Sequence, residues 1–226
     1  EKATDVAVLK DAGMTATSLC GKEELRLPFV EFQGLDVLVA LAQCPEEELQ
    51  AQAGSALEML TLNEASMKSI LDLPHGLVAL NALAKSTSEI VLSTCVQALS
   101  NLSTSSMCIR ISIDGGLSVL STLWLHGIPR ICDQILVILQ RVCCDGENLV
   151  AFIGGNGISL LETLIYDDCG PSANDEQHTM DSKMSSQEFA VNVLLRCSAD
   201  VSLAVNLLSE QVLSLLHYLI ASAMDN

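Results

Sequence analysis

The sequence predicts an all-α fold, a right-handed α-solenoid of about four to five repeats, from three observations. A Gly followed by an aliphatic residue opens an apolar stretch at Gly34, Gly76, Gly116 and Gly157, with spacings of 42, 40 and 41 residues. A second apolar helix reaches the same phase 22 residues after each of the first three glycines. Half of the residues are hydrophobic but only 3% are aromatic, which suits closely stacked helices. A period near 40 indicates units that bury their apolar faces only by stacking on each other.

The repeats are taken in order along one array that covers residues 1–226. Residues from about Thr4 to Leu19 align with the last helix of a repeat, so residues 1–22 are a partial repeat. Full repeats are expected at about 23–64, 65–105, 106–145 and 146–199, followed by a partial repeat at 200–226. Because a terminal repeat needs a polar outer face and the first helix carries apolar residues with nothing before it to cover them, we expect the chain to be part of a larger protein or this helix to be a special cap.

Within the first full repeat, a short helix precedes Gly34 and two more helices follow, from about Leu35 to Gln43 and from about Glu47 to Leu60. Pro45 and the acidic residues after it are typical of a helix N-terminus. In the fourth repeat the third helix arrives about 14 residues late, because a polar, acidic segment is inserted at 167–186. We expect this segment to be an exposed flexible loop, either a docking or modification segment or a plain insertion.

This order of a short helix, a Gly turn, GLxxLxxL, a marked turn and ALxxL resembles the armadillo repeat and its HEAT-like relatives. The resemblance implies that the third helices line a concave groove with a polar ladder, often of Asn. The ladder position falls on Met59, Asn101, Arg141 and Arg196, and Ser55, Gln97, Val137 and Asn192 lie one turn earlier. The Trp that nuclear-import receptors of the family place one turn before the Asn is absent at all four positions. The candidate protein-binding residues are Met59, Gln97, Asn101, Gln134, Val137, Arg141, Asn192 and Arg196.

Arg141 and Arg196 hold equivalent positions in a chain that has only 11 basic residues. Two interpretations stay open at this point. Neighbouring arginines in a groove can clasp an acidic or phosphorylated peptide. Alternatively, each arginine complements the negative end of a helix dipole while its stem covers apolar surface.

Composition and motifs exclude several function classes. Twenty-eight acidic residues against 11 basic ones give a formal net charge of −17, which argues against direct nucleic-acid binding. No apolar run is long enough to span a membrane. The nine cysteines show no metal-ligand spacing, and the four histidines are far apart, so we expect no metal, no cofactor and no enzymatic activity. An odd number of cysteines suggests a reducing compartment, the cytoplasm or the nucleus.

The sequence therefore predicts a non-enzymatic interaction scaffold or adaptor that binds a partner peptide or helix through the groove. Two other functions remain open. One is a nuclear transport or cargo receptor, which the negative charge permits and the degenerate ladder weakens. The other is a chaperone cofactor or nucleotide-exchange factor, since short armadillo-like domains can clamp a nucleotide-binding partner. Self-association through the exposed first helix is a further expectation.

Overall fold

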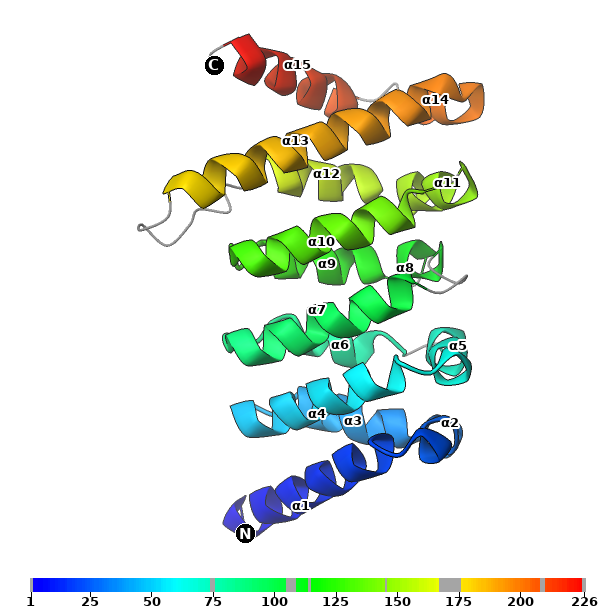
Figure 1. The fold of residues 1–226 in the computed structure, drawn as a ribbon, viewed down its shortest axis with the longest axis vertical. Helices are drawn as coiled ribbons and strands as arrows, with labels where there is room; N and C mark the ends of the chain where they lie inside the picture. Colours follow the sequence, from blue (N-terminus) through cyan, green and yellow to red (C-terminus); the bar gives the residue numbers. More distant parts are fainter. Residues whose placement is uncertain are drawn as a thin grey trace.

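The structure of the chain is a computed structural model, and it describes residues 2–73, 76–104, 109–113, 115–144, 146–166, 176–207 and 210–224. All regular secondary structure in these ranges is helical, and Figure 1 shows the helices stacked one above another along a single axis. The two ends of the chain lie at opposite ends of the stack. The prediction of an all-α solenoid is confirmed.

The helices follow a recurring order of a short helix, a second helix and a longer helix. Before the first full set comes α1 (Lys2–Cys20). The next sets are α2 (Glu23–Glu31), α3 (Gly34–Ala42) and α4 (Glu47–Leu60), and then α5 (Glu64–Asp72), α6 (Val78–Leu83) and α7 (Glu89–Ser103). They are followed by α8 (Ile109–Ile113), α9 (Gly116–Trp124) and α10 (Pro129–Val142), and by α11 (Gly146–Gly154), α12 (Gly157–Tyr166) and α13 (Glu176–Ala199). The last helices are α14 (Val201–Leu207) and α15 (Glu210–Met224).

Equivalent helices of successive sets pack on each other and form layers. The long helices α1, α4, α7, α10 and α13 contact one another in that order, and α3, α6, α9, α12 and α15 form a second layer behind them (Figure 1). Among the short helices, α2 contacts α5, and α11 contacts both α8 and α14. The long helices therefore line one face of the molecule side by side.

The four glycines that mark the period have a common structural reason. Each one lies where a second helix crosses closely over the preceding short helix, so a Cβ atom would collide with that helix. In chain order, a Cβ at these glycines would lie 2.5, 1.8, 2.8 and 2.4 Å from the carbonyl oxygens of Phe29, Ile70, Ile111 and Phe152. Any side chain there forces the two helices apart, and the period of glycines is a period of tight helix crossings.

The residue before the glycine reverses the chain direction at three of these crossings. Gln33, Gly115 and Asn156 have φ angles of 63°, 91° and 78°, in the left-handed region. At the last crossing the axes of α11 and α12 differ by 79°. Glycine adopts this conformation without steric cost, and Asn tolerates it better than most residues do.

The apolar core is continuous along the array rather than gathered at one centre. Leu, Ile, Val and Ala side chains supply most of it, and the largest fully buried side chains include Trp124 and Phe152. Of the described cysteines, Cys20, Cys95, Cys132, Cys143 and Cys197 are buried. Small thiols at these positions fit the close helix packing.

The expectation of a flexible loop over 167–186 is wrong for its second part. Residues 176–186 are helical and belong to α13, which begins at Glu176 and runs to Ala199. The reason is that the segment 176–186 contains neither Gly nor Pro, and five of its eleven residues favour a helix even when few apolar residues are present: Glu176, Gln177, Met180, Lys183 and Met184. Residues 167–175 lie outside the described residues.

No single described helix combines the length and the hydropathy of a membrane span, although the bent pair α11 and α12 reaches both when the two helices are taken together.

Candidate protein-binding surface

The solvent-exposed side of the long helices α1, α4, α7, α10 and α13 is here called the long-helix face. The predicted residues one turn before the ladder position lie on it with different exposure. Ser55 on α4 and Gln97 on α7 are half-buried, whereas Val137 on α10 and Asn192 on α13 are exposed. Gln134, one turn before Val137, is half-buried on α10. The helices thus bring the predicted residues onto one continuous surface.

The ladder position itself links each long helix to the one before it. Asn101 Nδ2 on α7 donates a hydrogen bond to Thr61 Oγ1, 3.1 Å away at the end of α4. Gln97 Nε2 donates to Asn101 Oδ1 at 3.2 Å and so holds the amide of Asn101 in place. Met59, the equivalent residue on α4, lies close to Gly21, just after the end of α1.

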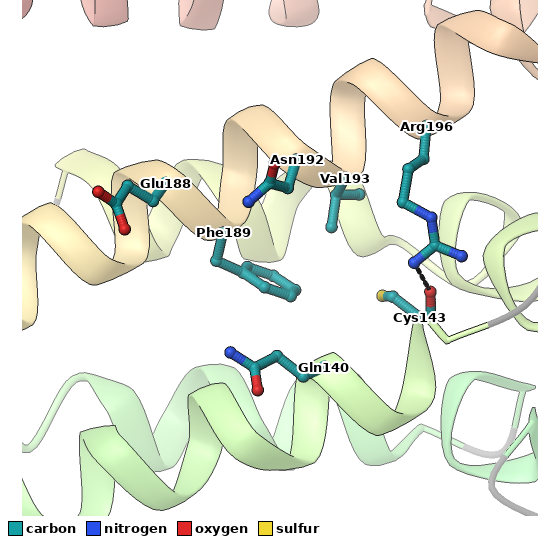
Figure 2. A pocket seen from close by; sticks show the side chains of 7 residues that line it. All are labelled: Gln140, Cys143, Glu188, Phe189, Asn192, Val193 and Arg196. Carbon is teal, nitrogen blue, oxygen red and sulfur yellow. Dashed lines mark hydrogen bonds between the residues drawn. The ribbon is translucent and has the colours of Figure 1, made fainter.

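The two arginines of the ladder make the same link with their guanidinium groups. Arg141 Nη1 on α10 donates to Ser100 Oγ and Ser103 Oγ of α7, at 3.2 Å each. Arg196 on α13 donates to the carbonyl oxygen of Cys143 (Figure 2) and, at 2.7 Å, to the carbonyl oxygen of Cys144. These carbonyls follow the end of α10, where helix carbonyls lack intrahelical partners.

Of the two interpretations of the arginines, the helix-end interpretation accounts for these contacts. A cation at a helix C-terminus is stabilised by the negative end of the dipole and by the free carbonyl groups. We call Asn101, Arg141 and Arg196 the backward ladder, because each donates to the preceding repeat. Their donor groups stabilise the stack itself, and this is the role that the structure gives them.

A pocket opens on the long-helix face between α10 and α13. Its cavity volume is about 190 Å³, and it is lined by Gln140, Cys143, Glu188, Phe189, Asn192, Val193 and Arg196 (Figure 2). The side chains of Phe189, Val193 and Cys143 are buried and form its apolar part. The side chains of Gln140, Glu188 and Asn192 are exposed at its rim.

Phe189 lines the pocket from a register position that differs from the other repeats. Its register position on α13 corresponds to Gln52, Thr94 and Gln134 on the earlier long helices, where the side chain is not a ring. Thr94 fits tightly against Gly54 of α4, and Gln52 fits tightly against Gly13 of α1. On α13 the same position carries a phenyl ring, which lines the pocket.

Sequence reasoning found Asn192 and Arg196 but missed the other residues of the pocket. A signal was present, since Phe189 is the one aromatic residue of the sequence within the spans of the five long helices. An aromatic side chain in a row of small and polar ones indicates a local change in helix spacing.

The long helices carry more acidic than basic side chains. Those with described side chains are Asp11, Glu47, Glu48, Glu58, Glu89, Asp133 and Glu188, against Lys10, Arg130, Arg141 and Arg196. Lys10 on α1 forms an ion pair with Glu48 on α4. Since Arg141 and Arg196 are bound to helix ends, the surface that remains for a partner is acidic.

No group of three or more metal-ligating side chains comes together in the ranges that the structure describes. Burial raises the pKa of the Cys20 thiol to about 11, and burial also raises the pKa of Cys95. A raised pKa keeps a thiol protonated and unreactive near neutral pH, as is typical of structural cysteines. His126, in the turn after α9, makes a 2.8 Å hydrogen bond with the Ala84 carbonyl oxygen of the preceding repeat.

Comparison with known proteins identifies the class of fold. A scan against protein-family models and a search of curated proteins gave no match. Among solved structures, two designed armadillo repeat proteins superpose on the chain with a TM-score of 0.52 each, at 17% and 18% sequence identity. The first, YIII(Dq)4CqI, matches over 90% of this chain and 88% of its own. The second, YIII(Dq.V1)4CPAF in complex with peptide (KR)4, matches over 95% and 93%.

The chain therefore has an armadillo-like repeat fold, an all-α solenoid. The resemblance deduced from the glycine turns and the ALxxL phase is confirmed at the level of the fold.

Proposed function

We propose that this protein is a non-enzymatic interaction scaffold that binds an extended peptide segment of a partner protein across its long-helix face. The observation that carries the proposal is the continuous face made by five stacked long helices, with a pocket between two of them (Figure 1). Stacked repeats offer extended surfaces that suit elongated ligands. The likeness to a designed armadillo repeat protein in complex with a peptide supports the same mode of binding.

The charge of the face favours a partner segment that carries basic residues. Acidic side chains outnumber basic ones on the long helices, and the whole chain has a formal net charge of −17. Opposite charges on two partners accelerate their encounter and suppress wrong partners.

An acidic or phosphorylated peptide was the partner that the two arginines suggested. This proposal has lost its main support, because the guanidinium groups of Arg141 and Arg196 donate to groups at the ends of α7 and α10. A phosphate could compete for these donors only by breaking contacts that stabilise the stack. We therefore propose a basic peptide segment, rather than an acidic or phosphorylated one, as the partner.

A photo-crosslinking experiment tests the proposal. A benzophenone amino acid is placed on the face, at Gln97, Val137 or Asn192, and as a matched control on the short helices, at Glu64 of α5 or Glu147 of α11. After irradiation in lysate, we expect partner crosslinks from the face positions, and mass spectrometry identifies the crosslinked segment. Partner crosslinks that form only from Glu64 or Glu147 would show that the protein binds through another side.

A second candidate, a nuclear transport or cargo receptor, is favoured by the acidic face and by the (KR)4 peptide bound to the designed relative. A pull-down with a basic localisation peptide, compared with a peptide of the same composition in scrambled order, separates the two. Order-dependent binding supports a cargo receptor, and equal binding supports a general acidic scaffold. A chaperone cofactor is tested by a nucleotide-release assay.

We also propose that the protein works in the cytoplasm or the nucleus. The free thiols of the described cysteines support a reducing compartment. Imaging of a fluorescent fusion of the protein tests this proposal, and a secreted fusion would contradict it.

A further inference from the structure

The pocket between α10 and α13 combines buried apolar side chains on its inner side with unpaired polar groups at its rim. Phe189, Val193 and Cys143 are 7%, 2% and 1% exposed and close the inner side. The amides of Gln140 and Asn192 reach the rim from opposite helices (Figure 2), and neither has a hydrogen-bond partner among the described residues. Apolar side chains beside a small number of polar groups are a common combination in ligand pockets.

The size of the pocket sets the size of its occupant. Its volume is about 190 Å³. A cavity of about 150 Å³ lined by apolar side chains accepts benzene, so the pocket accepts one Leu, Met or Phe side chain. Apolar surface is also exposed beyond the pocket, because Val137 on α10 and Leu195 on α13 are 43% and 65% exposed.

The charged residues around the pocket determine which residues can flank the bound side chain in the partner. Glu188 lies at the rim, and Asp133 holds the equivalent register position on α10. Both carboxylates are exposed, and within the described part of the chain neither has a basic partner. The one cation of the pocket, Arg196, is held by the carbonyls of Cys143 and Cys144.

From these observations we propose that the pocket is the anchor site for one apolar side chain of a partner peptide whose flanking residues are basic. The apolar side chain packs on Phe189 and Val193. The amides of Gln140 and Asn192 hydrogen-bond to the main chain of the extended peptide, and Glu188 and Asp133 attract the flanking Lys or Arg side chains. This inference rests on the proposed function and names the subsite and the chemistry that it selects.

Four synthetic peptides test the anchor directly against the whole chain. Each is fluorescein-labelled, about twelve residues long and built on a Ser-Gly background, which spans roughly 40 Å when extended. The central residue is Leu or Ser, and the two flanking residues are Lys or Glu. Fluorescence anisotropy measures the affinity. We expect the Leu/Lys peptide to bind roughly tenfold to a hundredfold more tightly than the Ser/Lys peptide, which is the effect of burying one Leu side chain.

Two variants locate the binding in the pocket. Gln140→Trp places a ring at the mouth, and we expect it to abolish the advantage of Leu over Ser. Gln211→Trp makes the same chemical change at an exposed site on α15 and should leave that advantage intact. Circular dichroism and the melting temperature show that both variants are folded. Glu188→Lys should weaken the Leu/Lys peptide roughly two- to fivefold and strengthen the Leu/Glu peptide.

The outcomes separate this inference from the proposed function. If the Ser/Lys peptide binds as tightly as the Leu/Lys peptide, the face attracts basic segments without an anchor, so the proposed function stands and the anchor is wrong. If Gln140→Trp and Gln211→Trp behave alike, the anchor lies elsewhere. If the Leu/Lys peptide does not bind at about 1 mM, corresponding to about −4 kcal/mol, the anchor is also wrong, and the crosslinking experiment alone decides on the face.

Discussion

The tight crossing at Gly157 leads to a prediction that compares two neighbouring glycines. Gly157 opens α12 directly beneath Phe152, and a Cβ there would lie 2.4 Å from the Phe152 carbonyl oxygen and 2.4 Å from its ring. Gly154, three residues earlier, ends α11 in open space with no atom within 4 Å of its Cβ position. Gly157→Ala and Gly154→Ala are therefore the same chemical change with and without a steric conflict.

The expected magnitudes follow from these distances. Real Cβ contacts essentially never fall below 3.0 Å, so the two helices must separate by about 0.6 Å or more. Overpacking of this kind costs about 1–3 kcal/mol, and the cost rises further if Phe152, which is fully buried, loses its packing. We expect Gly157→Ala to lower the free energy of unfolding by about 3 kcal/mol. Gly154→Ala should raise it by about 0.5–1 kcal/mol, because Ala restricts the unfolded chain.

Urea unfolding followed by circular dichroism measures both free energies. The two variants should move the midpoint in opposite directions with the same slope, and the difference between them should be about 4 kcal/mol. If Gly157→Ala stays within about 0.5 kcal/mol of the unsubstituted chain, the helices yield without cost, and close crossing is not the reason for the glycine period.

Three further substitutions and one labelling experiment test individual features of the structure. Arg196→Met keeps the apolar stem but removes the donors to the end of α10, and urea unfolding should show a loss of about 1–2 kcal/mol; an unchanged midpoint would mean that this link of the backward ladder is not formed in solution. Asn63→Ala removes the N-cap of α5 and should cost about 1 kcal/mol in the same assay, whereas a neutral result would show that the cap is dispensable. Gln33→Gly relieves a φ of 63° and should raise the thermal midpoint by the equivalent of about 0.5 kcal/mol; a lower midpoint contradicts this. Maleimide labelling read by mass spectrometry should modify the exposed Cys144 well before the buried Cys95, and equal rates would argue against the core position of Cys95.

The repeat architecture was predictable because a short helix cannot bury its apolar face alone. Leu57 and Leu99 hold equivalent positions in successive repeats because stacked helices need an apolar side chain there, and both side chains are buried in the core. The glycines could be recognised by their spacing, although the carbonyl contacts that require them become visible only in three dimensions. Long-range periodicity is thus a stronger guide here than local propensity.

The functional surface was less predictable, since it depends on contacts between repeats. Sequence register placed Arg141 and Arg196 at equivalent positions, but register does not say whether a guanidinium group faces a partner or the neighbouring helix end. Only the distances from the guanidinium groups of Arg141 and Arg196 to Ser103 Oγ and to the Cys144 carbonyl oxygen show that they face the neighbouring helix end. The pocket could not be predicted from the repeat pattern, because only one repeat has an aromatic residue, Phe189, at a register position where the others have a small or polar residue. The helix at 176–186 was missed because polarity was given more weight than helix propensity.

The backward ladder gives the array a direction. Each donor belongs to one unit and its acceptor to the unit before it, so the three junctions α4–α7, α7–α10 and α10–α13 have the same polarity. Removing one complete unit would again place a donor beside the end of a long helix, whereas a cut within a unit would leave a helix end without its donor. Length changes in such a protein are therefore best tolerated in whole units of about forty residues, and a deletion that ignores this boundary should unfold both of its neighbours.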